Sequence, residues 1–293
     1  MKSMRLKTLK TKGDKQMALS AALQEIHEWR GVEGLVAAEV LTDNDTDGYT
    51  TGDVFAIAGV AEISRTTDSS NEAHYYDNIP AIVISSTSAD EVTINASAIP
   101  LDVYAAITGQ YYDEDTGALI EGPRDVKYFA IGYITQKENG DPVYVWRYKG
   151  TFNIPSQTNS TVNDGTDANG QEIVYTGIST THKFVKTGKG AKSLNVDVAK
   201  NLASVTNFFD AVVTPDTLVG KTSYKLTISQ AANTTVSVKR GGIALATNAD
   251  IYSGDVLTIT VTGGTVTVNG TGFISGDMHV VTGAVAVVST ASA

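Results

Sequence analysis

The sequence predicts a mainly β fold with one or two short helices. Three observations lead to this prediction: apolar and polar residues alternate along many short segments, turn residues such as Gly, Asn, Asp and Ser separate these segments, and helical spacing of apolar residues is confined to a few stretches. The chain has 293 residues, 42% of them apolar, which suffices for a buried core. Its length suggests about two domains.

Charge divides the chain into three segments. Residues 1–30 carry a net charge of +4, residues 31–215 of −14 and residues 216–293 of zero, which together give the −10 of the whole chain. Segments that differ this sharply usually meet different surroundings. We therefore predict a basic N-terminal arm over 1–30, a middle domain over 31–215 and a C-terminal domain over 216–293.

The basic arm is predicted to contain a short amphipathic helix. Leu19, Leu23 and Ile26 lie at helical spacing and would share one face. The apolar stretch over 17–23 is too short for a signal peptide and is followed at once by polar residues. No apolar run approaches the roughly 18 residues of a membrane helix, so we expect no membrane insertion.

The first half of the middle domain is predicted to hold four strands and one helix. Residues 91–96 alternate between apolar and polar side chains, as in a half-buried strand. Pro100 and Gly109 suit the first turn and the C-terminal cap of a short helix over 100–107. The predicted strands cover residues 34–41, 54–64, 81–85 and 91–96.

The second half of the middle domain continues with strands and ends on a helix. Asn139-Gly140 separates the segments 126–135 and 143–152, and Asn-Gly between two strand patterns is a strong hairpin signal. A polar loop over 156–170 precedes a strand over 172–180. An amphipathic helix is predicted before Pro215 because apolar residues step by four and three, at Val198, Leu202, Val205, Phe209 and Val212.

The C-terminal domain is predicted to be a small β-sandwich. Short segments of alternating residues are separated by glycine turns, threonine is abundant on the polar face, and no helical period occurs. The stretch 214–221 is the predicted boundary with the middle domain. The predicted strands lie at 224–228, 236–238, 257–261 and 266–268.

The chain carries little catalytic equipment. It has no cysteine, which excludes disulfides, thiolate zinc sites, iron–sulfur clusters and cysteine nucleophiles. Its four histidines are far apart in the sequence, and no nucleophile elbow, phosphate loop or dinucleotide fingerprint occurs. We therefore expect no enzymatic activity and no cofactor.

A weak calcium candidate lies in an acidic turn of the middle domain. Asp43, Asp45 and Asp47 alternate ahead of Gly48, like the start of an EF-hand loop in which oxygen ligands converge on a hard cation. The position that should hold a bidentate glutamate is Val54, and strands rather than helices flank the loop. An acidic, solvated hairpin tip is therefore the favoured interpretation.

Several stretches of the middle domain, taken in order, resemble a known family. An opening strand leads into the acidic loop, a polar and aromatic segment contains His74-Tyr75-Tyr76-Asp77-Asn78, and a Tyr-rich strand precedes Pro155-Ser156-Gln157. The closing segment carries Phe208-Phe209 where the family commonly has Trp-Phe. In this order they resemble the major tail (tail tube) proteins of long-tailed bacteriophages, in particular the phi13-type family. The stretches are 31–42, 70–78, 91–94, 99–109, 144–157 and 207–212.

The resemblance implies a structural virion protein of the phage tail, made in the cytoplasm of the bacterial host. It implies two packed β-sheets with a helix, assembled into stacked hexameric rings whose inner strands join into one barrel without exposed edges. The C-terminal domain is similar in architecture to the Ig-like accessory domains of such proteins. The implied partners are copies of the chain itself and the tape measure, tail terminator and baseplate proteins.

In the implied tube, double-stranded DNA passes through the lumen into the host without specific binding. The acidic balance of 31–215 suits this passage, because basic side chains would hold the phosphates. We hypothesise that the basic arm and the acidic loop over 42–53 make ring-to-ring contacts, since opposite charges would set the register. The residues concerned are Lys2, Arg5, Lys7, Lys10, Asp43, Asp45, Asp47 and Asp53.

An alternative function belongs to a different class of protein. The Tyr-rich strands and the neutral, Thr-rich C-terminal domain would also suit a secreted or surface carbohydrate-binding β-sandwich module. Such a module would stay small in solution and bind a glycan. A glycosidase would require a specific pair of carboxylates, and the sequence singles out none.

Overall fold

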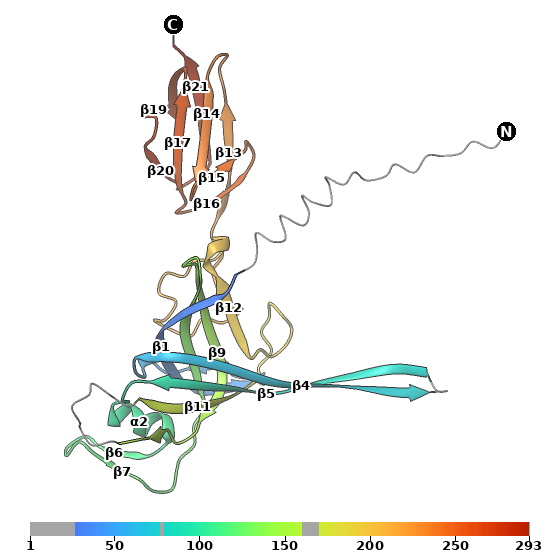
Figure 1. Cartoon of the computed structure of the whole chain (residues 1–293), viewed down its shortest axis with the longest axis vertical. Coiled ribbons are helices and arrows are strands. Elements are labelled where there is room, and N and C mark those ends of the chain that lie inside the picture. The colour runs from blue at the N-terminus through green and yellow to red at the C-terminus, as the bar shows by residue number, and fades with distance from the viewer. Residues whose placement is uncertain (1–26, 77–78, 160–169, 293) are drawn as a thin grey trace, which may run out of the picture. The chain divides into compact units, whose positions relative to one another are not determined.

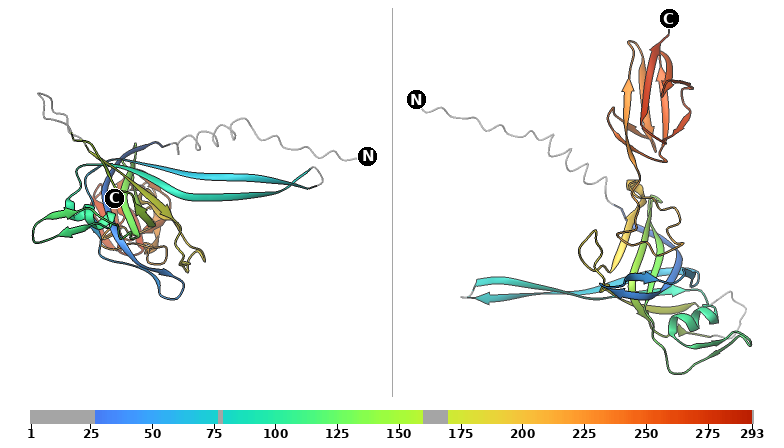
Figure 2. Two further views of the ribbon diagram at one scale, coloured as in Figure 1. Left: turned by 90° about the horizontal axis from the view of Figure 1, so that it is seen from below. Right: turned by 180° about the vertical axis from the view of Figure 1, so that it is seen from behind.

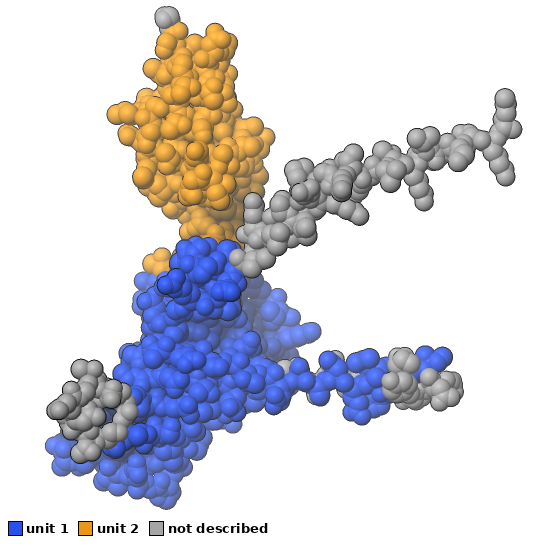
Figure 3. Space-filling model, viewed as in Figure 1, with its two compact units in different colours: residues 1–197, 207–216 blue, residues 198–206, 217–293 orange. Residues whose placement is uncertain are grey.

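The structure is a computed structural model that describes residues 27–76, 79–159 and 170–292. Its chain divides into two compact units (Figure 3). Unit 1 runs to Asp197 and takes in Asn207–Asp216, whereas unit 2 consists of Val198–Thr206 and the chain from Thr217 onward. The mainly β prediction is confirmed, because strands dominate both units. The helix predicted around Leu19 lies outside the described residues.

Unit 1 is built around one sheet in which ten strands take part (Figure 1). The main path has the order β2-β1-β8-β9-β11-β5-β4, and β3, β10 and β12 pair alongside β1, β11 and β9. The strands are β1 Trp29–Asn44, β2 Gly48–Thr51, β3 Phe55–Ala56, β4 Val60–Tyr76, β5 Ile79–Ala96, β8 Phe129–Lys137, β9 Pro142–Phe152, β10 Ser156–Gln157, β11 Gln171–Ile178 and β12 Ser193–Asp197.

Strand β9 lies in the middle of this sheet and is buried on both faces. Because side chains alternate along a strand, Trp146 and Tyr148 share one face and Val145 and Arg147 share the other. The indole Nε1 of Trp146 donates a hydrogen bond of 3.1 Å to the carbonyl of Phe208. One face of β9 therefore packs on an aromatic cluster, and the other faces a polar network described below.

The predicted hairpin and the first predicted helix are both confirmed. Strands β8 and β9 pair down to Gln136 and Pro142, and Gly140 in the connecting turn has a φ of 88°. Helix α2 spans Leu101–Thr108 and ends at Gly109, whose left-handed conformation lets its N–H bond the carbonyl of Ala105. A separate hairpin follows, formed by β6 Tyr111–Asp113 and β7 Ala118–Ile120.

The amphipathic helix predicted over 198–212 is wrong. The structure has a short 3-10 helix, η1 Val198–Lys200, followed by turns. Asn201 and Asn207 adopt φ values of 54° and 58°, which break an α-helix. The apolar spacing spans two neighbouring segments that belong to different compact units, 198–206 in unit 2 and 207–216 in unit 1. Leu202, on the predicted apolar face, is 52% exposed.

Two strand predictions also needed correction. Residues 81–85 and 91–96 are parts of one strand, β5, because the polar stretch between them pairs with β4 as well. The predicted strand over 54–64 is interrupted, and β3 and β4 lie on either side of Gly59. In both cases the pairing partner decides whether a polar stretch is extended, and that partner is distant in the sequence.

Unit 2 is a sandwich of a five-stranded and a four-stranded sheet around one core of valine, leucine and isoleucine. The order of the first sheet is β16-β13-β21-β18-β19, and that of the second is β15-β14-β17-β20. The four strands predicted here are confirmed. All nine are β13 Ser223–Ser229, β14 Thr235–Arg240, β15 Ile243–Leu245, β16 Asp250–Tyr252, β17 Val256–Thr262, β18 Gly264–Val268, β19 Thr271–Phe273, β20 Met278–Val280 and β21 Val285–Ala291.

Replacing Gly150 of β9 by alanine is expected to destabilise unit 1 by about 1–3 kcal/mol. A Cβ at this position would lie 2.4 Å from Cζ of Tyr175 and 2.5 Å from the carbonyl oxygen of Thr176. Tyr175 is fully buried and its hydroxyl donates to the carbonyl of Phe129, so the ring cannot move aside. Denaturant unfolding measures the loss, and Gly122→Ala, where nothing lies within 4 Å, serves as the control.

Candidate assembly surface

The acidic turn between β1 and β2 is fastened to the rest of unit 1 through Asp43. One carboxylate oxygen of Asp43 accepts a hydrogen bond of 2.6 Å from Lys149 Nζ and one of 2.9 Å from the N–H of Thr181. The other oxygen accepts a bond of 2.8 Å from the N–H of His182. The Asp43 side chain is only 4% exposed. Asp43 therefore ties the turn to β9 and to the loop after β11.

The other carboxylates of the acidic loop face solvent. Asp45 is exposed and accepts bonds from the N–H and Nζ of Lys183, at 3.1 and 3.2 Å. Asp47 and Asp53 are exposed as well, and Asp47 accepts a bond from the amide of Asn44. Within the described residues there is no group of three or more His, Cys, Asp or Glu side chains arranged to hold a metal ion.

The stabilising contacts of Asp43 should depend on pH. Burial raises the pKa of its carboxyl, but the bonds from Lys149, Thr181 and His182 outweigh burial, so the pKa lies below its usual value. A lowered folded-state pKa contributes stability above the unfolded-state value of about 3.9, and this contribution is lost as the pH falls through the folded-state pKa.

We therefore expect Asp43→Asn to lower the free energy of unfolding of unit 1 by about 2 kcal/mol at pH 7. The difference between the variant and the unmodified chain should shrink toward zero as the pH falls through the lowered folded-state pKa of Asp43, because both chains then carry an uncharged side chain. Urea unfolding at a series of pH values measures this convergence. A difference that stays constant with pH would contradict the assignment, and Asp53→Asn, an exposed carboxylate, is the control.

A second carboxylate, Asp90, lies where the large sheet divides. The first half of β9 pairs with β12, and its second half pairs with β11, which continues to β5 and β4. Asp90 of β5 is 3% exposed and accepts bonds from Arg147 of β9 at 2.8 Å, from Lys192 before β12 at 3.0 Å and from Thr67 of β4 at 2.9 Å. This one side chain therefore links the two groups of strands that pair with β9, namely β12 on the one hand and β11, β5 and β4 on the other.

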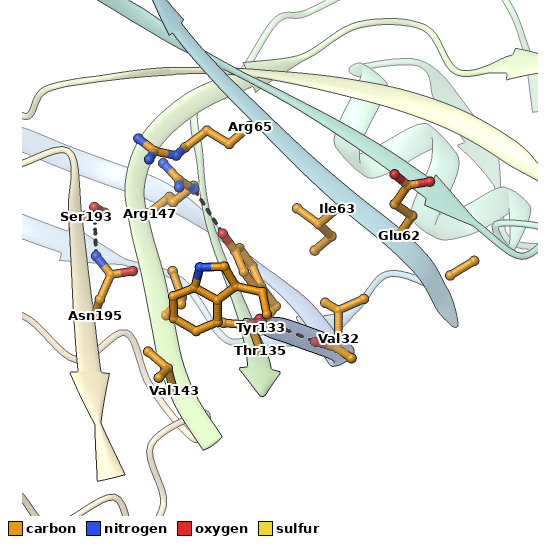
Figure 4. A pocket seen from close by; sticks show the side chains of 14 residues that line it. Val32, Glu62, Ile63, Arg65, Tyr133, Thr135, Val143, Arg147, Ser193 and Asn195 are labelled. Carbon is orange, nitrogen blue, oxygen red and sulfur yellow. Dashed lines mark hydrogen bonds between the residues drawn. The ribbon is translucent and has the colours of Figure 1, made fainter. Parts of the chain in front are cut away.

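A groove with a volume of about 550 Å³ adjoins this division and is lined by β1, β4, β8, β9 and β12 (Figure 4). In the described part of the chain, β4 pairs only with β5 and β12 only with β9, so each has one edge without a strand partner. Arg65 and Arg147 lie together at one end of the groove, and the exposed Trp29 also lines it. Its apolar part is formed by Val32, Ile63, Tyr133, Val143 and Val145.

The outer part of the β4–β5 hairpin projects from unit 1 as a two-stranded ribbon (Figures 1 and 2). We call residues 69–76 and 79–87 the ribbon. Its strands pair with each other from Ser69–Thr87 to Tyr76–Ile79, whereas β11 pairs with β5 only from Asp90 onward. Both edges of the ribbon therefore lack strand partners in the described structure. Ile79, Ile82 and Val83 are 63%, 51% and 62% exposed.

The basic half of the hypothesised ring-to-ring contact, Lys2, Arg5, Lys7 and Lys10, lies outside the described residues. The description begins at His27, whose Nδ1 lies 2.7 Å from a carboxylate oxygen of Glu138. The N–H of Glu28 donates to the other oxygen of the same carboxylate, also at 2.7 Å. These two bonds attach the residues just before β1 to the turn between β8 and β9.

Sequence reasoning missed Asp90, Arg147, Trp29 and the ribbon. Asp90 is separated by 57 residues from Arg147 and by 102 residues from Lys192, so no local pattern links them. One signal was present in the sequence: no lysine or arginine occurs from Thr66 to Pro123, which includes the whole ribbon.

Comparison with known proteins agrees with the resemblance noted in the sequence. A family model described as phage tail tube protein matches residues 32–223. No curated protein matches the chain. The matched range takes in the acidic turn, Asp90, the ribbon and the groove apart from its lining residues Trp29 and Gly31.

Proposed function

Because the chain belongs to the phage tail tube protein family, we propose that it forms the tube of the tail as stacked hexameric rings through which DNA passes into the host. Family membership makes it a structural protein of a phage tail that associates with copies of itself. The proposal adds the ring, its sixfold symmetry, the stacking and the passage of DNA. We also propose that the phi13-type assignment holds and that unit 2 is an Ig-like accessory domain.

The observation that carries this proposal is the ribbon. An isolated two-stranded hairpin is marginally stable in water, and free edges with exposed apolar side chains invite pairing with another chain. Ile79, Ile82 and Val83 therefore favour a protein whose surface is completed by neighbours. A closed ring of copies supplies such neighbours without leaving free edges.

Charge supports the proposed passage of DNA. Residues 31–215 carry a net charge of −14, and a lumen lined by carboxylates repels phosphates instead of holding them. In the proposed stack, Asp45, Asp47 and Asp53 offer exposed carboxylates to the basic arm of the next ring, and Asp43 fixes the turn that carries the first two.

The remaining parts of the proposal follow from a purely structural role. We propose no catalytic activity and no cofactor, synthesis in the host cytoplasm, and tape measure, tail terminator and baseplate proteins as partners along the tube. Among the described residues no helix is long and apolar enough to cross a membrane.

Electron microscopy of the purified full-length chain, with light scattering on the same sample, tests the proposal. We expect rings or tubes with a central hole and sixfold symmetry in end views. A chain that stays monomeric at all concentrations and binds glycans on an array would overturn the tube and favour the carbohydrate-binding alternative. Deleting residues 1–16 tests the arm: unchanged tube length and stability would exclude it from the ring-to-ring contact.

A further inference from the structure

The ribbon and the groove are complementary features on the same unit. The ribbon exposes apolar side chains on both of its faces, since Ile82 and Val83 are neighbours along β5 and point to opposite sides. The groove has an apolar floor that includes Tyr133, Val143 and Val145, and the edges of β4 and β12 beside it have no strand partner among the described residues.

We propose that the groove of one copy receives the ribbon of a second copy of this chain. The proposal rests on the proposed function, since it names the contact through which neighbouring subunits of a ring hold each other. Ile82 or Val83 of the incoming ribbon packs on the apolar floor, and the ribbon backbone lies along the edge of β12 by strand addition. Trp29, 67% exposed at the groove, closes over the ribbon from the side.

Charge favours the ribbon as the occupant. The ribbon contains one acidic residue, Glu72, and no lysine or arginine. The end of the groove holds Arg65, whose side chain is half exposed and whose distance to Asp90 is 3.9 Å, a loose ion pair. Arg147 and Lys192 make shorter ion pairs with the same carboxylate, at 2.8 and 3.0 Å. Three cations thus share Asp90, which lies beside the groove but does not line it. Glu62 is the only carboxylate that lines the groove in the described structure.

The basic arm of the same chain is a rival occupant, because Leu19, Leu23 and Ile26 could present an apolar face to the groove. It carries a net charge of +4 over residues 1–30, which the arginines at the end of the groove would repel. We therefore assign the groove to the ribbon, and the experiment below includes the arm as a separate outcome.

The contact is of the head-to-tail kind, since the ribbon and the groove are different surfaces of unit 1. Such contacts form a closed ring when the rotation between copies closes, and an open filament when it does not. Each copy then gives its ribbon to one neighbour and receives one from the other. This explains why a single copy exposes the apolar side chains of the ribbon and also has an unoccupied groove.

Disulfide cross-linking tests the proposal, and the absence of cysteine from the chain removes background thiols. Two full-length variants are mixed, one with Val83→Cys in the ribbon and one with Asn195→Cys at the groove. The control replaces the second variant by Val185→Cys, which is 89% exposed on a loop of unit 1 away from the groove. We expect the ribbon–groove pair to cross-link about tenfold more than the control pair after assembly and mild oxidation.

A second readout uses Trp29→Ala, with Tyr111→Ala on β6 as a matched control, since both aromatic side chains are about two thirds exposed at 67% and 64%. Only the Trp29 variant should be impaired in ring formation. The protein concentration at which it forms rings should rise by about tenfold or more, because tryptophans at interfaces carry much of the binding energy. Thermal unfolding of both variants should stay close to that of the unmodified chain.

The outcomes separate the two proposals. If the unmodified chain forms no rings or tubes, the proposed function fails and this inference fails with it. If tubes form but the cross-link does not exceed the control, the inference alone is overturned. An intramolecular disulfide between Leu23→Cys and Asn195→Cys in one chain, in place of the ribbon cross-link, would assign the groove to the basic arm.

Discussion

Replacing Asp90 by asparagine should destabilise unit 1 by about 3–5 kcal/mol, the largest effect expected for any single substitution in this chain. Arg147 is only 5% exposed, and Asp90 is the carboxylate that its NH1 contacts at 2.8 Å. The amide of asparagine leaves that guanidinium buried without a counter-charge. The same change removes the charge partner of Lys192 and so loosens the branch of the sheet that carries β12.

Tryptophan fluorescence during denaturant unfolding measures this effect selectively. The chain has two tryptophans, Trp29 and Trp146, and both lie in unit 1. Asp68→Asn changes an exposed carboxylate on the same hairpin and should alter the free energy of unfolding by less than about 0.5 kcal/mol. Equal stabilities of the Asp90 and Asp68 variants would mean that the ion pairs of Asp90 do not stabilise unit 1 and that backbone pairing alone holds these strands together.

Acid should weaken the same contact. Burial raises the pKa of Asp90, but the bonds from Lys192 and Thr67 and the charge of Arg147 outweigh burial, so the pKa is lowered. As for Asp43, the stabilisation is therefore complete above the unfolded-state pKa and disappears as the pH falls through the folded-state pKa. The two carboxylates bind different cations of β9, Asp43 to Lys149 and Asp90 to Arg147, so their effects should add.

How far the sequence predicts this fold depends on whether the signal is local. The helix over Leu101–Thr108 and the Asn139-Gly140 hairpin were predictable because their caps and turn residues lie next to the elements they end. The alternating strands of both units were predictable for the same reason. The short strands β15, β16, β19 and β20 have only three residues each and carry too few side chains for a period.

The surfaces that we propose for assembly were not predicted, because each is defined by strand pairing in the folded chain. The groove combines β1, β4, β12 and the predicted β8–β9 hairpin, and only the two strands of that hairpin are neighbours in the sequence. The predicted helix over 198–212 failed because a helical spacing can arise from two segments that belong to different compact units. For the ribbon, the sequence predicted a strand over 81–85, but only the pairing shows that its two strands pair with each other and with no other strand of the described structure.

Removing the ribbon should abolish assembly while leaving unit 1 folded. In this variant an Asn-Gly turn replaces residues 69–87, so that Asp68 and Ser88 remain and the hairpin closes with a two-residue turn. The bond from Ser88 Oγ to the carbonyl of Asp68 and the contacts of Asp90 are retained. In the described structure the two strands of the ribbon pair with each other and with no other strand, so the free energy of unfolding should change by less than about 1 kcal/mol.

Electron microscopy and sedimentation of this variant should show monomers at concentrations where the unmodified chain forms tubes, because an interface deprived of its central apolar contacts loses most of its binding energy. The matched control keeps the whole ribbon and carries Asp68→Asn, an exposed position just before it, which preserves Ile79, Ile82 and Val83. Tubes formed by the truncated chain would show that subunits are held through other surfaces. A truncated chain that unfolds would instead show that the ribbon supports its own sheet, and Ile82→Asp with Val83→Asp, which keeps the strands paired, would then decide between the two roles.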